Sequence, residues 1–293
     1  MNVKQDFQVE ITRQMLDAYP VKKYEEKEIP VRSGNVKVYL YNPDRETEQL
    51  PVVFYLHGGG FVKGHHIRDN YFCQKICYHV GALVIDIDYS TAPEHPFPCA
   101  LYEGYDTVAY FMAQAEQYRI NKDAVYLMGN SAGGNLAAGI TRLSIEQKAP
   151  FRIRKLVLNW APMDLFTPHR EKASEWNEQM EKTAERGAYY NECYAKGEDL
   201  RNPLISPLYT EMEILEQFPE TFIMAAGLDL LCQENIDFGK KLKNGKVKVT
   251  VKQMEGCHHG FITNLKDNWE AGEQLIFRFL SGMDSADGTE KEN

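Results

Sequence analysis

The stretch "MGNSAGGNLA", residues 128–137, decides the fold of this chain because it places a serine between a strand and a helix. It follows the apolar run "AVYLM" (124–128), and Gly129 and Gly133 flank Ser131 in the pattern G-x-S-x-G. A sharp strand-to-helix turn strains the serine backbone, and only very small neighbours fit beside it. The pattern predicts that the Ser131 hydroxyl is presented at the carboxyl end of a strand, in front of a helix N-terminus. Taken alone, it leaves open a tight turn in which the serine merely caps a helix.

Short β-branched runs alternate with longer helical stretches along the rest of the chain. Almost wholly apolar strands that alternate with helices predict an α/β fold with a mostly parallel, doubly wound sheet. We expect the earliest strands to be antiparallel. The expected strands are "VKVYLY" (36–41), "VVFYL" (52–56), "ALVIDI" (82–87), "AVYLM" (124–128), "KLVLNW" (155–160), "TFIMAA" (221–226) and "VKVTVKQM" (247–254). The expected helices cover about 70–80, 100–118, 132–147, 234–242 and 269–280.

The length of 293 residues suits a single α/β domain, which we expect to span residues 1–280. Two segments interrupt the alternation of strands and helices. Residues 1–24 are expected to contain an amphipathic helix, and residues 164–209 are helical and highly charged. We expect both segments to form a cap over the strand ends. The polar, acidic residues 281–293 are expected to be disordered.

Composition excludes several classes of partner. The net charge of −9 disfavours nucleic acids and anionic membrane surfaces. The sequence contains no run of 18 apolar residues and no visible secretory signal, so we expect a cytoplasmic protein that does not bind membranes. The six cysteines are sparse, and we expect Cys73 and Cys77, four residues apart in a helix, to pack in the core rather than to bind a metal.

A glycine run after an earlier strand offers backbone donors. In "YLHGGGF" (55–61), three consecutive glycines follow a buried strand, and an acyl-transfer intermediate needs such N–H groups around its oxyanion. We assign the N–H groups of Gly58, Gly59 and Ala132 to an oxyanion hole. A flexible loop is the alternative, whereas a phosphate-binding loop would require a following Lys-Ser/Thr pair that is absent.

A nucleophilic serine requires a base and an acid, which follow it in the chain order serine, acid, histidine. We expect His259, in "EGCHHGF" after the last strand, to be the base, with His258 as its rival. The acid follows one of two strands. We favour Asp229 over Asp164, because the loops that carry Asp229 and His259 follow neighbouring strands, and we expect Asp164 to fix the start of the cap.

These motifs together resemble the hormone-sensitive-lipase-like family of α/β-hydrolases. "HGGGF", "DYSTAPEHPFP" (88–98), "GNSAGGNLA" and "HGF" come in the order of that family, and "GLDLL" (227–231) stands where the family has its acid. The resemblance covers about residues 31–280. It implies an α/β-hydrolase fold with a helical cap and a carboxylesterase that acts on short-acyl esters without a cofactor.

The chain departs from the family pattern at two points. Asn130 stands where the family usually has an acid, and Ser90-Thr91 stand where it often has Arg-Leu. Asn130 is not expected to take part in the chemistry, so activity should survive this change, whereas an expectation for the pH optimum does not carry over. We interpret residues 88–98 as a structural loop beside the active site.

The sequence therefore predicts a serine carboxylesterase with a small-molecule ester substrate and neither metal nor cofactor. Two alternatives stay open: a serine peptidase of related fold, and a non-catalytic small-molecule-binding protein on the same scaffold. The natural ester and the oligomeric state, monomer or homodimer, are also open. So is the role of the aromatic residues in the cap, which could contact substrate or only pack: Trp176, Tyr189, Tyr190 and Tyr194.

Overall fold

An eight-stranded sheet forms the centre of the computed structural model, which describes residues 9–45, 49–172 and 178–283. The spatial order is β1-β2-β4-β3-β5-β6-β7-β8. β1 pairs antiparallel with β2, and β2 pairs antiparallel with β4, whereas all pairs from β4 to β8 are parallel. The strands are β1 (Lys23–Val31), β2 (Gly34–Asn42), β3 (Leu50–Leu56), β4 (Leu83–Asp88), β5 (Ile120–Asn130), β6 (Lys155–Asn159), β7 (Glu220–Ala226) and β8 (Val249–Met254).

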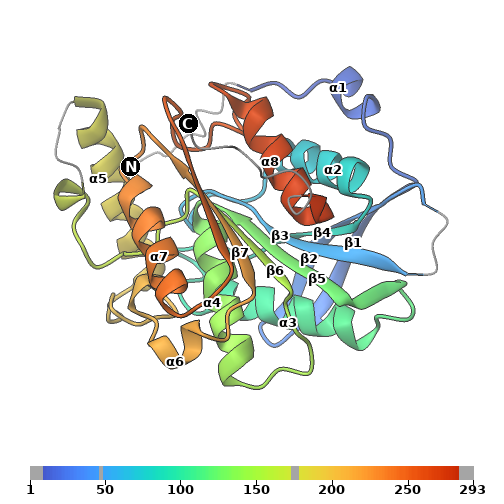
Figure 1. Cartoon of the computed structure of the whole chain (residues 1–293), viewed down its shortest axis with the longest axis horizontal. Coiled ribbons are helices and arrows are strands. Elements are labelled where there is room, and N and C mark those ends of the chain that lie inside the picture. The colour runs from blue at the N-terminus through green and yellow to red at the C-terminus, as the bar shows by residue number, and fades with distance from the viewer. Residues whose placement is uncertain (1–8, 46–48, 173–177, 284–293) are drawn as a thin grey trace, which may run out of the picture.

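Helices cover both faces of this sheet (Figure 1). The central strand β3 shows why: Val52, Phe54 and Leu56 point into one apolar cluster, and Val53 and Tyr55 into another. One face carries α3 (Cys99–Ala113), α4 (Ala132–Glu146) and α7 (Cys232–Asn244), and the other carries α2 (Ile67–Val80) and α8 (Trp269–Ser281). The predicted doubly wound α/β fold with antiparallel early strands is confirmed.

The N-terminal region differs from its prediction. The expected helix over residues 1–24 is reduced, within the described part, to the five-residue helix α1 (Arg13–Asp17). α1 buries none of its residues, and residues 23–24 already belong to β1. Only Ile29 of β1 is fully buried, so this edge strand lacks the apolar run of the central strands. Residues 1–8 lie outside the described residues.

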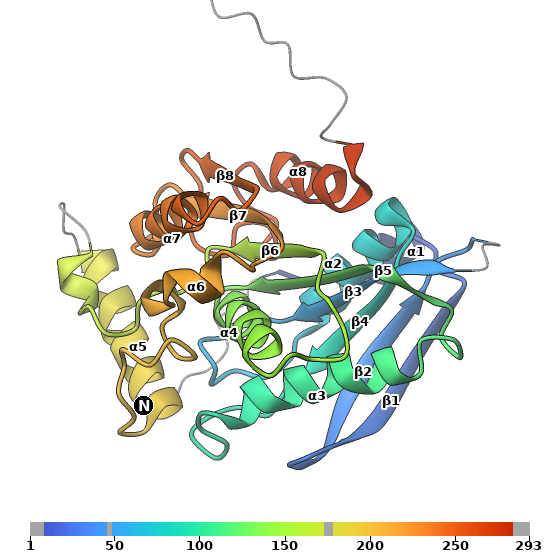
Figure 2. The same cartoon turned by 60° about the horizontal axis from the view of Figure 1, so that its bottom comes forward.

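The charged insertion is helical, as predicted. It contains the short helix η1 (His169–Glu171), the long helix α5 (Glu178–Ala195) and the short helix η2 (Pro207–Tyr209). α5 stands apart from the helices that cover the sheet (Figure 2). We call residues 164–209 the cap; Trp176 lies outside the described residues. The helix α6 (Met212–Leu215) follows the cap and leads to β7.

Several smaller expectations concern the core and the termini. Cys73 and Cys77 are buried in the apolar cluster beneath α2, as predicted, and all six cysteines are unpaired. The expected disordered tail falls mainly on residues 284–293, which lie outside the described residues; Ser281 is the last residue of α8. In the described ranges, no helix combines the length and the apolar character that a membrane span requires.

Candidate active site

Ser131 occupies the sharp turn between β5 and α4 that the glycine pattern predicts. Its backbone angles are φ 51° and ψ −121°, a strained conformation for a residue with a side chain. A Cβ atom at Gly129 would lie 2.1 Å from the Gly133 carbonyl oxygen, and one at Gly133 would lie 2.0 Å from the Leu56 carbonyl oxygen. Both positions therefore require glycine, and the crowding fixes the serine in front of the first turn of α4.

The structure brings Ser131, His259 and Asp229 into one hydrogen-bonded chain. His259 Nε2 lies 2.8 Å from Ser131 Oγ, and His259 Nδ1 lies 2.6 Å from Asp229 Oδ2. A carboxylate can only accept, so Nδ1 carries the ring proton and Nε2 is free to accept the serine proton. The Asp229 side chain is 3% exposed and that of His259 is 39% exposed. The hydrogen-bonded chain thus runs from the buried carboxylate of Asp229 to the partly exposed Ser131.

Short turns hold the acid and the histidine in place. Asp229 follows β7, and its Oδ1 accepts the Leu231 N–H at 3.2 Å. The rival base His258 points elsewhere: its ring Nδ1 and its backbone N–H both contact Asp267 Oδ2, at 3.1 and 2.8 Å. Asp267 therefore anchors the loop that carries His259. The hydrogen bond to the backbone N–H of His258 is the main cause that lowers the pKa of the Asp267 carboxyl.

Asp164 has a different role, at the start of the cap. Its Oδ1 accepts the backbone N–H groups of Phe166 and Thr167, at 2.9 and 3.1 Å, and so closes a turn just after β6. This agrees with the expectation that Asp164 fixes the start of the cap and that Asp229 contacts the histidine.

The loop that contains Gly58, Gly59 and Gly60, here called the glycine loop, lies beside Ser131. An added Cβ atom at Gly58 would lie 3.4 Å from Ser131 Cβ. His57 is fully buried, stacks on Tyr89 at 4.1 Å and contacts the Gly58 carbonyl oxygen through Nδ1 at 2.8 Å. The carbonyl only accepts, so Nδ1 is protonated, and burial lowers the pKa of His57. A neutral His57 thus orders the loop.

The loop 88–98 supports this region from the side. Tyr89 Oη donates to the His57 carbonyl oxygen at 2.8 Å, and the Ala92 N–H donates to the Phe61 carbonyl oxygen at 2.8 Å. These contacts agree with the expectation of a structural loop beside the active site.

Behind the serine, Asn130 belongs to a buried polar chain. Its Nδ2 donates to Tyr55 Oη at 2.8 Å, and its Oδ1 accepts from Asn159 Nδ2 at 2.7 Å. Tyr55 Oη in turn donates to Asp69 Oδ1 at 3.0 Å. The amide is therefore used both as donor and as acceptor, which a carboxylate at this position could not do.

The cap approaches the glycine loop through aromatic side chains. Tyr194 stacks on Phe61 with ring centroids 3.8 Å apart and is 1% exposed, so it packs the cap. Tyr190 lies against Gly60. A cavity of about 930 Å³ lies between α5 and residues 165–170, and Tyr189 is one of its lining residues. In the parts of the chain that the structure describes, no cluster of three or more His, Cys, Asp or Glu residues could hold a metal ion.

Comparison with known proteins assigns the chain to a family. A profile described as alpha/beta hydrolase fold matches residues 53–263. The chain belongs to the α/β-hydrolase family. Its predicted resemblance to the hormone-sensitive-lipase-like branch is confirmed.

Individual relatives agree with this assignment. The α/β-hydrolase is 30% identical to an esterase of Fusarium pseudograminearum, over 72% of this chain and 66% of that protein. Its structure is similar to a hyperthermophilic esterase of the archaeon Pyrobaculum calidifontis, with a TM-score of 0.84 and 27% identity over 93% and 89% of the two chains. It is also 28% identical to the gibberellin receptor GID1C of Arabidopsis thaliana, over 76% of this chain and 65% of that protein. The alignments thus span somewhat less than two thirds of the fungal and plant relatives.

Proposed function

We propose that this α/β-hydrolase is a carboxylesterase that cleaves small, short-acyl esters through an acyl-enzyme. The observation that carries the proposal is the hydrogen-bonded chain from Ser131 through His259 to Asp229. The esterases among its sequence relatives and structural neighbours support the ester-hydrolase class.

The first half of the reaction acylates the serine. Ser131 Oγ attacks the ester carbonyl carbon while its proton passes to His259 Nε2, and Asp229 stabilises the imidazolium that forms. The carbonyl oxygen becomes an oxyanion, for which we propose the backbone N–H groups of Gly58, Gly59 and Ala132 as donors. The imidazolium then protonates the alkoxide, the carbon–oxygen bond breaks, and the alcohol leaves.

The second half releases the acid. A water molecule gives a proton to His259 Nε2 and attacks the acyl carbon, and a second oxyanion occupies the same site. His259 returns the proton to Ser131 Oγ as the acyl–serine bond breaks. Every proton is accounted for by one histidine, so the reaction needs neither a metal nor an organic cofactor.

A paired assay tests the proposal against the two alternatives. The purified protein is incubated with a fluorophosphonate, p-nitrophenyl butyrate and an aminoacyl p-nitroanilide. A carboxylesterase is labelled and hydrolyses the ester much faster than the anilide. Faster anilide cleavage would instead favour the serine peptidase. A protein that is neither labelled nor active would favour the binding protein, a class that the receptor among the relatives exemplifies.

A further inference from the structure

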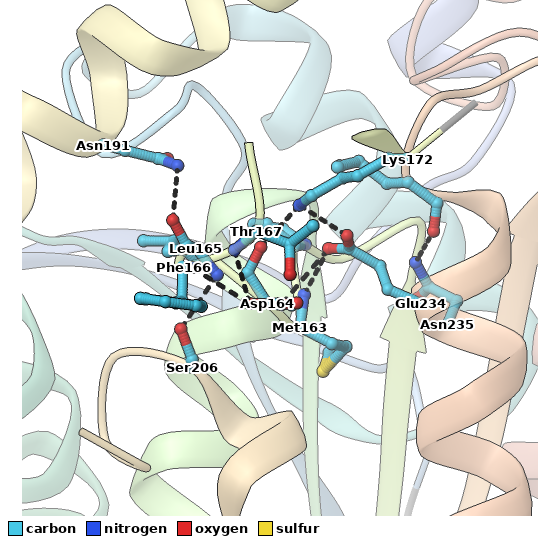
Figure 3. Close-up of polar contacts among 12 residues, drawn as sticks. Met163, Asp164, Leu165, Phe166, Thr167, Lys172, Asn191, Ser206, Glu234 and Asn235 are labelled. Atoms are coloured by element: carbon cyan, nitrogen blue, oxygen red, sulfur yellow. Dashed lines mark hydrogen bonds and ion pairs between the residues drawn. The ribbon is translucent and has the colours of Figure 1, made fainter. Parts of the chain in front are cut away.

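A buried ion pair joins the cap to the helix that follows Asp229. Lys172, which ends the short helix η1, places Nζ 2.6 Å from Glu234 Oε2 in the first turn of α7 (Figure 3). Each of these side chains is 6% exposed. Sequence reasoning gave no role to either residue, because the contact joins segments that are distant along the chain.

Both charged groups also hold the backbone between β6 and η1. Glu234 Oε1 accepts the N–H groups of Met163 and Asp164, at 2.7 and 3.3 Å, and Lys172 Nζ donates to the Asp164 carbonyl oxygen at 2.5 Å (Figure 3). Burial raises the pKa of the Glu234 carboxyl to about 7. A buried carboxylate is costly unless it is paired and hydrogen-bonded, so the anion depends on Lys172.

The neighbouring residue Asn235 strengthens the same junction. Its Oδ1 accepts the Ala161 N–H at 3.1 Å, and its Nδ2 donates to the Ala161 carbonyl oxygen at 2.8 Å. The first turn of α7 therefore fixes the chain from the end of β6 into the cap. This turn begins directly after the loop that positions Asp229.

From this junction, contacts lead to the cap helix α5. Asn191 Nδ2 donates to the Leu165 carbonyl oxygen at 3.4 Å (Figure 3). His169 packs so closely on α5 that a Cβ atom at Gly187 would lie 2.4 Å from its Nε2. On the same helix, Tyr190 lies against Gly60 of the glycine loop. The ion pair is thus connected through α5 to the loop that we propose holds the oxyanion.

The same segment forms one wall of the cavity of about 930 Å³ inside the cap. Leu165 and Phe166 lie on this wall, and Ala184 and Ala188 of α5 lie opposite. A shift of residues 164–172 away from α7 would therefore change both the cavity and the position of α5.

We propose that Lys172 and Glu234 are positioning residues for ester hydrolysis. Their buried pair holds residues 163–172 against α7, and thereby holds α5 over the glycine loop in the arrangement that binds the ester. This inference rests on the proposed esterase function. Neither residue contacts the reacting atoms, so their loss should weaken substrate binding more than it slows the chemical step.

The chain offers a matched control pair on the opposite face of the sheet. Lys75 of α2 and Glu273 of α8 form a second buried ion pair, with side chains 2% and 4% exposed. Burial raises the pKa of the Glu273 carboxyl to about 7 as well. The rings of Trp269 and Tyr71 flank Lys75, and none of these four residues belongs to the cap or to the glycine loop. The two pairs share their chemistry and differ in location.

The test compares Glu234→Gln with Glu273→Gln. For the bulky ester 1-naphthyl butyrate, we expect Glu234→Gln to raise KM about tenfold and to change kcat less than about threefold, the signature of lost binding. We expect Glu273→Gln to lower the melting temperature comparably while KM stays within about twofold of the wild-type value. An equal KM in both variants would overturn the inference, because it would reduce Lys172 and Glu234 to ordinary stabilising residues.

A third variant tests the pairing itself. Lys172→Met should raise KM in the same direction as Glu234→Gln, and the double variant should raise it no further than the worse single variant, since both remove one interaction. Additive effects on KM would contradict the pairing.

A readout independent of activity separates this inference from the proposed function. Hydrogen exchange of the α5 amides (Glu178–Ala195) should accelerate in Glu234→Gln and stay unchanged in Glu273→Gln. If the wild-type protein hydrolyses no ester, the proposed function fails, and this exchange still decides whether the pair holds the cap. Unchanged exchange in both variants would show that the pair does not hold α5.

Discussion

Tyr190 of the cap helix lies directly on Gly60 of the glycine loop. A Cβ atom at Gly60, where φ is +63°, would lie 2.0 Å from Tyr190 Cδ2. Glycine is thus required at this position both by its backbone conformation and by the aromatic ring. The contact places a bulky side chain of the cap beside the proposed oxyanion donors, and we propose that it limits the depth of the acyl pocket.

This contact leads to a prediction about acyl length. Each methylene that fits adds about 0.8 kcal/mol of transfer free energy, whereas one that must displace packed side chains costs about 1–3 kcal/mol. We expect kcat/KM for p-nitrophenyl esters to peak at about two to six acyl carbons and then to fall. A maximum at palmitate, or activation by emulsified triglyceride, would contradict the short-acyl proposal.

Shortening the aromatic residue should move this maximum. In Tyr190→Ala, we expect the peak to shift by about two or more carbons toward longer esters, because the ring no longer closes the pocket. Tyr78→Ala provides the control, since Tyr78 is 47% exposed on α2 at the opposite face of the sheet. An unshifted profile in Tyr190→Ala would show that other residues set the pocket depth.

The acid assignment predicts a ranking of two matched variants. Asp229→Asn should lower kcat on the order of 10⁴-fold, by analogy with the loss of the correct imidazole tautomer in serine proteases. Asp164→Asn should cost far less, because an amide oxygen can still accept from Phe166 and Thr167. Both kcat values are measured with p-nitrophenyl butyrate at one pH. The reverse ranking would contradict the assignment of Asp229.

Asn130 leads to a prediction about stability. In Asn130→Asp, the new carboxylate would face Tyr55 Oη, whose proton is already donated to Asp69. Burial should raise the pKa of the new carboxyl, so the variant should lose stability as pH rises through that pKa, by about 1–3 kcal/mol. Urea unfolding of wild type and variant at pH 5 and pH 8 measures this loss. A variant that matches wild type at both values would show that the site accommodates a charge.

The lowered pKa of the cap residue His169 predicts that the free energy of unfolding falls at acidic pH. Burial is the main cause that lowers the pKa of His169 from 6.5 to about 4. The positive charge of Lys172 also lowers this pKa, whereas the negative charges of Asp229 and Asp164 raise it. The folded state therefore binds fewer protons than the unfolded state between about pH 6.5 and 4, and stability falls as pH falls through this window. His169→Gln should weaken this dependence of the unfolding free energy on pH. An unchanged pH profile would contradict a neutral, half-buried His169.

The sequence predicts well what depends on local patterns. The turn at Ser131 follows from Gly129 and Gly133, because neither position has room for a side chain. The choice of Asp229 over Asp164 follows from the order of neighbouring strands, and the structure places Asp229 against His259.

Other features have no local signal. β1 lies at a sheet edge, carries a run of charged residues and buries only Ile29 fully, so it lacks the apolar run of a central strand. The pair of Lys172 and Glu234 depends on how the cap packs on α7. The charged, helical pattern of the cap does not allow a prediction of which lysine contacts which glutamate. The contact of Tyr190 with Gly60 likewise joins segments that are distant along the chain, so only the folded structure shows it.

Hydrolysis of p-nitrophenyl butyrate by wild type and Ser131→Ala tests the central claim most directly. Circular dichroism and thermal unfolding would first establish that the variant is folded. We predict that the wild type hydrolyses the ester and reacts with a fluorophosphonate, and that the variant does neither, because loss of the nucleophile in such a site costs several powers of ten in kcat. A folded variant that retains more than about a tenth of the wild-type kcat would contradict the assignment of Ser131 as the nucleophile.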